Sequence, residues 1–81
     1  MTAKLKVTRA EYIRDLANTK IEKGAYEQLA GAYRTLAAMP ENEGINRTLF
    51  LSKAAGFTNT ANRCGVFLEK LEAIDQSELL P

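Results

Sequence analysis

Apolar residues recur with a helical period over residues 8–39, which predicts two helices joined as a hairpin. The segment Thr8–Glu11 (TRAE) has the residue types of a capping box, a signal for the start of a helix. We expect the first helix to end at Gly24 and a second helix to run from Ala25 to Met39, before Pro40. The residues expected to face inward in this pair are Ile13, Leu16, Ala17, Ile21, Tyr26, Leu29, Ala30, Tyr33, Leu36 and Ala37.

The pattern of residues 45–74 predicts a second pair of helices. The third helix would begin near Ile45 or Asn46, with Asn46 as the candidate N-cap, and would run to Ala55, where Gly56 closes it. The segment 57–60 (FTNT) would form the turn, and the fourth helix would run to about Ile74. The expected inward residues of these helices are Leu51, Ala54, Ala55, Ala61, Cys64, Phe67, Leu68 and Leu71, with Leu49 or Phe50 contributing.

These elements predict a small all-α domain of four helices that spans residues 1–81. Residues 1–39 would form the helical hairpin, and residues 40–44 (PENEG) the loop after it. Residues 45–74 would form the helix-turn-helix pair. The last residues, 75–81, are polar apart from two leucines, so we expect them to fray.

The composition is that of an ordinary globular protein. Of 81 residues, 46% are hydrophobic and 26% are charged, and the formal net charge is +1. We find no apolar run long enough to cross a bilayer and no secretory signal, so we expect a cytoplasmic protein. The small net charge disfavours a nucleic-acid binder held mainly by electrostatic attraction.

The residue types argue against an enzyme. The chain has no histidine and a single cysteine, Cys64, so it lacks the usual ligands of a zinc site and cannot form an internal disulfide. No glycine loop that could cradle a phosphate is present, and no clear acid pair. We therefore expect no catalytic residue, metal or cofactor, and we interpret Cys64 as a small core residue.

One window in the second half of the chain contains basic residues but no acidic residue. Between Glu43 and Glu69 there is no acidic residue, and this window contains Arg47, Lys53 and Arg63. The same window contains the turn predicted between the third and fourth helices, where an anionic partner would find both cations and polar side chains.

The segment 51–71 (LSKAAGFTNTANRCGVFLEKL) is similar to the helix-turn-helix of small bacterial, phage and plasmid regulators, and the resemblance extends weakly over residues 45–72. It implies that Gly56 makes the turn and that a recognition helix, about 59–72, enters the major groove of double-stranded DNA. The residues expected to contact DNA are Arg47, Lys53, Thr58, Asn59, Thr60, Asn62 and Arg63, with Lys4, Lys6 and Arg9 adding backbone contacts. The pattern departs at Asn62, which stands where the motif has its first buried aliphatic residue.

The segment 24–42 (GAYEQLAGAYRTLAAMPEN) resembles the second half of a tetratricopeptide repeat, in a match that covers about residues 6–42. Leu29 and Leu36 replace expected alanines, and Pro40 comes one residue early. A single repeat cannot bury its faces, so the family's peptide binding is not implied. Tyr26 and Tyr33 are the candidate partner-binding residues here, although their spacing also fits core positions.

Two functions lead at the level of sequence, and a structural subunit of a larger helical assembly is a third possibility. The first is a small DNA-binding transcriptional regulator of the phage or mobile-element type, acting as a homodimer on two half-sites. The second is a helical protein-interaction module, an adaptor or inhibitor of a larger complex, with no DNA contact. The acid-free window favours the first, and the near-zero net charge favours the second.

Overall fold

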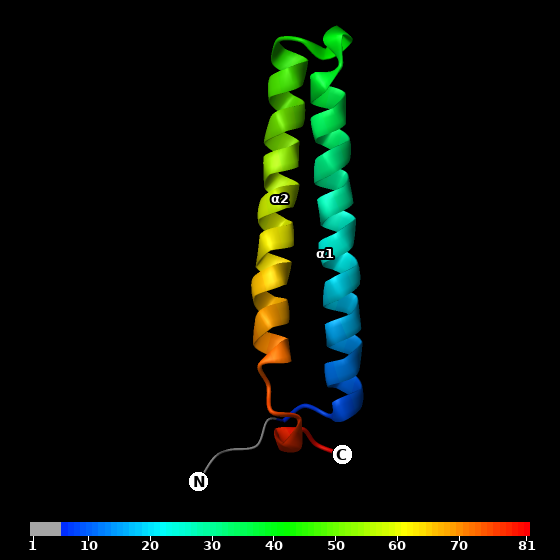
Figure 1. The fold of residues 1–81 in the computed structure, drawn as a ribbon, viewed down its shortest axis with the longest axis vertical. Helices are drawn as coiled ribbons and strands as arrows, with labels where there is room; N and C mark the ends of the chain where they lie inside the picture. The colour runs from blue at the N-terminus through cyan, green and yellow to red at the C-terminus, as the bar shows by residue number, and fades with distance from the viewer. Residues whose placement is uncertain (1–5) are drawn as a thin grey trace.

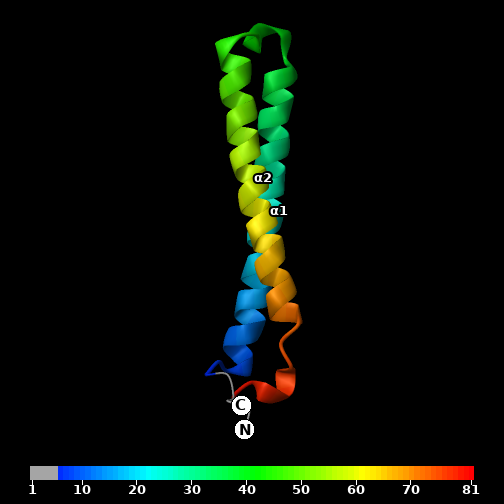
Figure 2. The ribbon, with the colours of Figure 1, turned by 90° about the vertical axis from the view of Figure 1, so that its left-hand side faces the viewer.

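The computed structural model describes residues 6–81, which form an extended hairpin of two long helices (Figure 1). Helix α1 spans Arg9–Ala38 and helix α2 spans Ile45–Glu72. Two short 3-10 helices, η1 (Pro40–Asn42) and η2 (Gln76–Glu78), lie at opposite ends of the hairpin. The molecule measures 60 × 21 × 14 Å, so it is one helix thick and two helices wide. The helices cross in the perpendicular view of Figure 2.

The prediction of an all-α protein is confirmed, but the prediction of a four-helix domain was wrong. Gly24 lies inside α1 and Gly56 inside α2, and neither has the left-handed backbone that ends a helix. A glycine inside a helix costs only about 1 kcal/mol relative to alanine. Contacts with the other helix continue on both sides of each glycine, and these offset that local cost. Residues 57–60, predicted to be a turn, are therefore helical.

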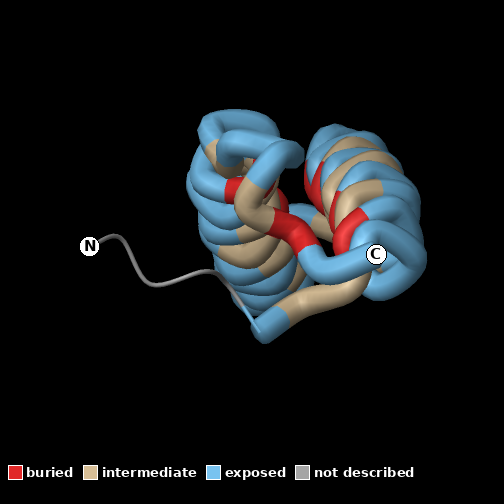
Figure 3. Tube along the Cα trace, turned by 90° about the horizontal axis from the view of Figure 1, so that it is seen from below, coloured by how far each residue is buried: buried red, intermediate tan, exposed pale blue. Residues whose placement is uncertain are grey.

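One stripe of each helix faces the other, and we call these two stripes the seam. Its residues follow one another at alternating spacings of three and four, the repeat of an antiparallel coiled coil. The seam consists of Tyr12, Leu16, Thr19, Lys23, Tyr26, Ala30, Tyr33 and Ala37 in α1 and of Arg47, Phe50, Ala54, Phe57, Ala61, Cys64, Leu68 and Leu71 in α2; all are buried or half-buried. Figure 3 shows the buried stretches turned toward the space between the helices and exposed stretches outside.

Small and aromatic residues alternate along the loop half of the seam. Ala30 and Ala37 of α1 and Ala54 and Ala61 of α2 recur at seven-residue spacing and are only 1–3% exposed. Between them the ring of Phe57 stacks on two tyrosines of α1, with centroids 6.0 Å away for Tyr26 and 5.6 Å for Tyr33. The alanines let the helices approach closely, while the aromatic rings fill the remaining space.

The open end of the hairpin holds the cluster of large buried side chains. Tyr12, Leu71 and Leu79 pack together there, and Val7, Leu16 and Ile74 pack partly buried against them. Residues 75–81, which we expected to fray, continue this cluster. The N–H of Arg9 donates to the carbonyl of Leu80, and the N–H of Leu80 donates to the carbonyl of Val7, both at 2.9 Å.

The helix ends follow local signals in most cases. The Thr8 side chain caps α1 by accepting a 3.1 Å hydrogen bond from the N–H of Glu11, as predicted. Helix α1 ends at Ala38, just before Pro40, also as predicted. The N-cap of α2 is Gly44 and not Asn46. Gly44 has φ 77°, a left-handed backbone that glycine adopts most readily, so the reversal of the chain is made there.

Several residues expected to face inward lie on the surface. In α1, Ile13 is 57% and Ile21 is 70% exposed, while the buried positions of this part of α1 are Tyr12 and Thr19. In α2, Leu51 is 47% and Phe67 is 50% exposed; Ala17, Leu29 and Ala55 are also exposed. The reason is geometric: one neighbouring helix covers only a narrow stripe, whereas a four-helix domain would cover a broad face.

None of the helices described for residues 6–81 is both long enough and apolar enough to cross a membrane.

Candidate functional site

Three of the residues predicted to contact DNA lie on the outer side of α2. Asn59, Asn62 and Arg63 are exposed and project from the middle of a continuous helix. The phase departure noted at Asn62 has a simple cause, because the seam passes through Phe57, Ala61 and Cys64 and leaves Asn62 outside. The turn that would hold a recognition helix at its N-terminus is not formed, since Gly56 and its neighbours are helical.

Three other predicted residues are engaged in the hairpin itself. The half-buried Arg47 donates from Nε to the carbonyl of Ala37 at 2.6 Å, which joins the start of α2 to the end of α1. The hydroxyl of Thr58 accepts a 3.1 Å hydrogen bond from Nη1 of Arg34. The hydroxyl of Thr60 donates to the carbonyl of Gly56, one turn earlier, at 3.0 Å. These groups hold one helix to the other or bond within α2.

Lys53, the remaining predicted cation of α2, lies beside an aromatic ring. The ammonium of Lys53 lies 5.8 Å from the ring centroid of Tyr33, within the range of a cation–π contact. Tyr33 and Tyr26 are half-buried in the seam against Phe57, so most of each ring faces the hairpin. Of the remaining predicted cations, Lys6 and Arg9 are exposed, and Lys4 lies outside the described residues.

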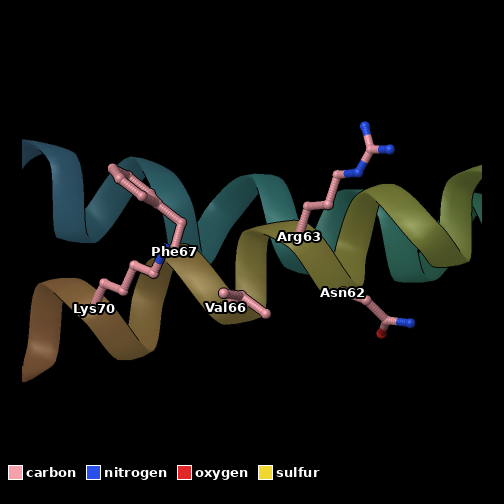
Figure 4. A pocket seen from close by; sticks show the side chains of 5 residues that line it. All are labelled: Asn62, Arg63, Val66, Phe67 and Lys70. Atoms are coloured by element: carbon pink, nitrogen blue, oxygen red, sulfur yellow. The ribbon is translucent and has the colours of Figure 1, made fainter.

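A surface patch on α2 has the chemistry of a docking site. It is lined by Asn62, Arg63, Val66, Phe67 and Lys70, and we call it the α2 patch. Val66 is 53% and Phe67 is 50% exposed, although both are large and apolar. Figure 4 shows the five side chains projecting from successive turns of α2, with Arg63 and Asn62 splayed to opposite sides. The surface is shallow and open, which suits a macromolecule better than a small ligand.

The charge around the α2 patch is positive. Arg63 and Lys70 flank the two apolar residues, and no carboxylate lines the patch. The ion pairs formed among residues 6–81 are Arg14–Asp15 and Lys23–Glu27, so neither patch cation takes part in one. An apolar centre with cations at its rim matches a partner that presents apolar side chains next to carboxylates.

A polar notch opens beside Phe67, across the seam. It is lined by Asp15, Asn18, Thr19 and Glu22 of α1 and by Cys64 and Phe67 of α2. This notch shows that the acidic residues of α1 and the Phe67 edge of the α2 patch lie on the same side of the hairpin. Among the described residues no group of three histidine, cysteine or acidic side chains is placed to hold a metal ion.

Two side chains among residues 6–81 have a shifted pKa. The hydrogen bond from Lys23 Nζ to Glu27, 2.6 Å long, together with the charge of Glu27, raises the pKa of Lys23. The aliphatic part of Lys23 lies over Gly65, where an added Cβ would come within 3.2 Å of Cε, so Gly65 makes room for this lysine. The N–H and hydroxyl of Ser77 both donate to the Asp75 carboxylate, and they lower its pKa.

Sequence reasoning missed Val66, Phe67 and Lys70 as site residues. The helical period predicts a core position for Phe67, because it falls near Cys64 and Leu71 on a helical wheel. The signal that could have found the patch is the three–four spacing of the seam in α2, which leaves Val66 and Phe67 outside. That spacing becomes visible only if the helix is assumed to continue through Gly56.

Comparison with known proteins finds no family model, no curated protein and no solved structure that matches this chain.

Proposed function

We propose that this chain is a non-enzymatic helical interaction module, an adaptor or inhibitor, which binds a protein partner through the α2 patch. The observation that carries the proposal is the half exposure of Val66 and Phe67 between two cations that form no ion pair with any of residues 6–81. Adjacent large apolar side chains are kept exposed at some cost in solubility, and such patches mark interaction sites.

The shape of the hairpin supports the same function. A rigid pair of helices presents side chains along two turns of α2 at fixed spacing, which is the geometry of recognition by a helix face. The seam already holds α2 in place, so the α2 patch contributes little to folding. The complementary partner surface would carry apolar residues to cover Val66 and Phe67, with carboxylates near Arg63 and Lys70.

Site-specific photo-crosslinking tests this proposal. A photoreactive amino acid is placed at Val66 and, as a matched control, at Ile21, which is 70% exposed on α1. Irradiation of cells that produce the protein should give a defined protein adduct from position 66 and not from position 21. The proposal fails if position 66 gives no adduct, or if both positions give the same set. An adduct between two copies of the chain is also recognisable, by its mass of about twice 9.0 kDa.

DNA binding is a second candidate function, and one observation favours it. Asn59, Asn62 and Arg63 are exposed along one stretch of α2 and free to meet base edges. The absence of a turn before them and the net charge of +1 weigh against it. Titration of mixed duplex DNA at low and moderate salt, with Arg63→Ala beside the parent chain, decides the matter. A lack of binding at low salt would remove this function.

A further inference from the structure

We infer that a second copy of this chain packs in parallel on Arg63, Phe67 and Lys70 of the α2 patch to form a four-helix bundle. This inference rests on the proposed function and names its partner. Its basis is a pattern of charge and apolar residues that extends from the α2 patch across the seam onto α1. We call this side of the hairpin the bundle face, the side on which Glu22, Leu29, Leu49 and Phe67 lie.

The coiled-coil repeat defines which residues share the bundle face. In both helices the residue just before each seam position lies on the same side of the seam. In α1 these residues include Asp15, Glu22 and Leu29, and in α2 they include Lys53 and Phe67. The notch that joins Asp15 and Glu22 to Phe67 supports this placement. Leu51, by contrast, lines the opposite side together with Arg34 and Ala38.

The antiparallel contacts fix which residues lie at the same height. Tyr12 bonds to Leu71, and Arg47 bonds to Ala37, so the two helices run in register from end to end. At the open end the bundle face is therefore acidic on α1, at Asp15 and Glu22, and basic on α2, at Arg63 and Lys70. Toward the loop it carries Leu29 and Leu36 of α1 and Leu49 of α2, and Lys53 is the charged residue of α2 there.

Only one orientation of a second copy matches this pattern. A two-fold axis along the length of the hairpin places α1 of one copy against α2 of the other at the same height. Glu22 then faces Arg63 of the second copy, Asp15 faces Lys70, and Leu36 faces Leu49. A two-fold axis across the width of the hairpin would instead pack α1 of one copy against α1 of the other in antiparallel orientation. The carboxylates of one copy would then meet the leucines in the loop half of the other. Charge complementarity thus selects the parallel arrangement.

Gly56 is compatible with this arrangement. A Cβ added at Gly56 would meet no atom within 4 Å, so the hairpin itself does not require glycine there. Gly56 is exposed on the bundle face at the height of Leu29, which is 41% exposed. In the parallel arrangement Leu29 of one copy sits over Gly56 of the other, and the missing side chain makes room for it.

The bundle face is large enough for a stable dimer. Helices of this length run about 42–45 Å, because each residue rises about 1.5 Å. With a width of 21 Å the face offers on the order of 900 Å² per copy. A specific interface of standard size buries about 800 Å² per partner. One second copy can therefore cover Leu29, Leu49 and Phe67 together.

Sedimentation equilibrium from about 1 µM to 1 mM tests the dimer with two matched pairs of variants. Leu49→Asp and Gly56→Leu lie on the bundle face, whereas Leu51→Asp and Gly24→Leu lie elsewhere. Both leucines are exposed, and an added Cβ meets no atom within 4 Å at either glycine. We expect the parent chain to reach about twice 9.0 kDa. The bundle-face variants should raise the dissociation constant of the dimer at least 10-fold, and the control variants should raise it less than threefold. Circular dichroism checks that each variant stays helical. A parent chain that stays monomeric, or a dimer indifferent to the bundle-face variants, overturns the inference.

A charge exchange tests the orientation. Glu22→Arg and Arg63→Glu should each weaken the dimer, and the double variant should recover most of the loss, because the pair is restored with reversed signs.

Spin labels at Glu43→Cys in a Cys64→Ala background measure the distance between the two loops. A distance below about 35 Å supports the parallel bundle, whereas one near the 60 Å length of the hairpin rules it out. If the chain stays monomeric while position 66 still crosslinks to another protein, the proposed function survives and this inference falls.

Discussion

The hydroxyl of Tyr12, near the start of α1, donates a 2.9 Å hydrogen bond to the main-chain carbonyl of Leu71, at the end of α2. The two residues are 59 positions apart in the chain, and both are buried. This bond closes the open end of the hairpin, opposite the loop. It also places Tyr12 against Leu79, so the C-terminal segment is held by the same contact.

Tyr12→Phe keeps the ring and removes this bond. The Leu71 carbonyl retains the N–H of Ile74 as a partner, at 3.1 Å, so it is not left unsatisfied. We therefore expect a loss of about 1 kcal/mol in the free energy of unfolding, measured by urea denaturation. Tyr12→Ala removes the ring as well and should cost about 3 kcal/mol or more. Equal losses for both variants would contradict this assignment.

Phe57 and Phe67 form a natural comparison within α2. Phe57 stacks between two tyrosines in the seam, whereas Phe67 is 50% exposed. Phe57→Ala should lower the free energy of unfolding by about 3 kcal/mol, because it opens a gap between the helices. Phe67→Ala should change it by less than about 1 kcal/mol when urea denaturation is done at low micromolar concentration. A larger loss for Phe67→Ala than for Phe57→Ala would contradict the placement of Phe57 in the seam.

Arg47 connects the two helices next to the loop. Its guanidinium bonds to the Ala37 carbonyl near the C-terminus of α1, where a positive charge also favours the helix dipole. Arg47→Ala should therefore destabilise the hairpin by about 1–2 kcal/mol in thermal or urea unfolding. Arg14→Ala is the control, because Arg14 is exposed and contacts its neighbour Asp15; its effect should stay within about 0.5 kcal/mol.

The helical glycines should respond differently to alanine. Gly24→Ala meets no atom within 4 Å and should stabilise the chain by about 1 kcal/mol through helix propensity. Gly65→Ala meets Lys23 Cε at 3.2 Å, so the lysine stem must shift and the gain should be smaller. Urea denaturation of both variants measures the difference. A larger gain at Gly65 would show that Lys23 does not pack there.

The Asp75 carboxylate gives a prediction about acid. Because Ser77 donates to its charged form, the pKa of Asp75 in the folded chain lies below its ordinary value of 3.8. A lowered folded pKa means that the contribution to stability is present above pH 3.8 and is lost as the pH falls through the folded value. Carboxyl NMR titration should show this low pKa, and Ser77→Gly, which keeps the N–H, should raise it only in part. A pKa at or above 3.8 in the parent chain excludes the capping role.

Part of the candidate site could be anticipated from sequence. Asn62 and Arg63 were selected from the sequence as binding residues, and both line the α2 patch. Their role in binding stays a prediction. Val66 and Phe67 could not be selected, because an apolar residue on a helix is assigned to the core unless the width of the covered stripe is known. In a two-helix hairpin that stripe is one seam wide, so both residues remain on the surface.

The amino-acid sequence by itself determined the features that have local causes. Thr8 and Glu11 begin α1, Pro40 ends it, and all-helical structure follows from the period of the apolar residues. The tertiary structure alone decided that the chain continues as helix through Gly24 and Gly56. The cost of a helical glycine is local and about 1 kcal/mol. The contacts that offset it, such as Tyr33 with Phe57 and Lys23 with Gly65, join residues more than twenty positions apart. That balance exists only once the two helices lie side by side.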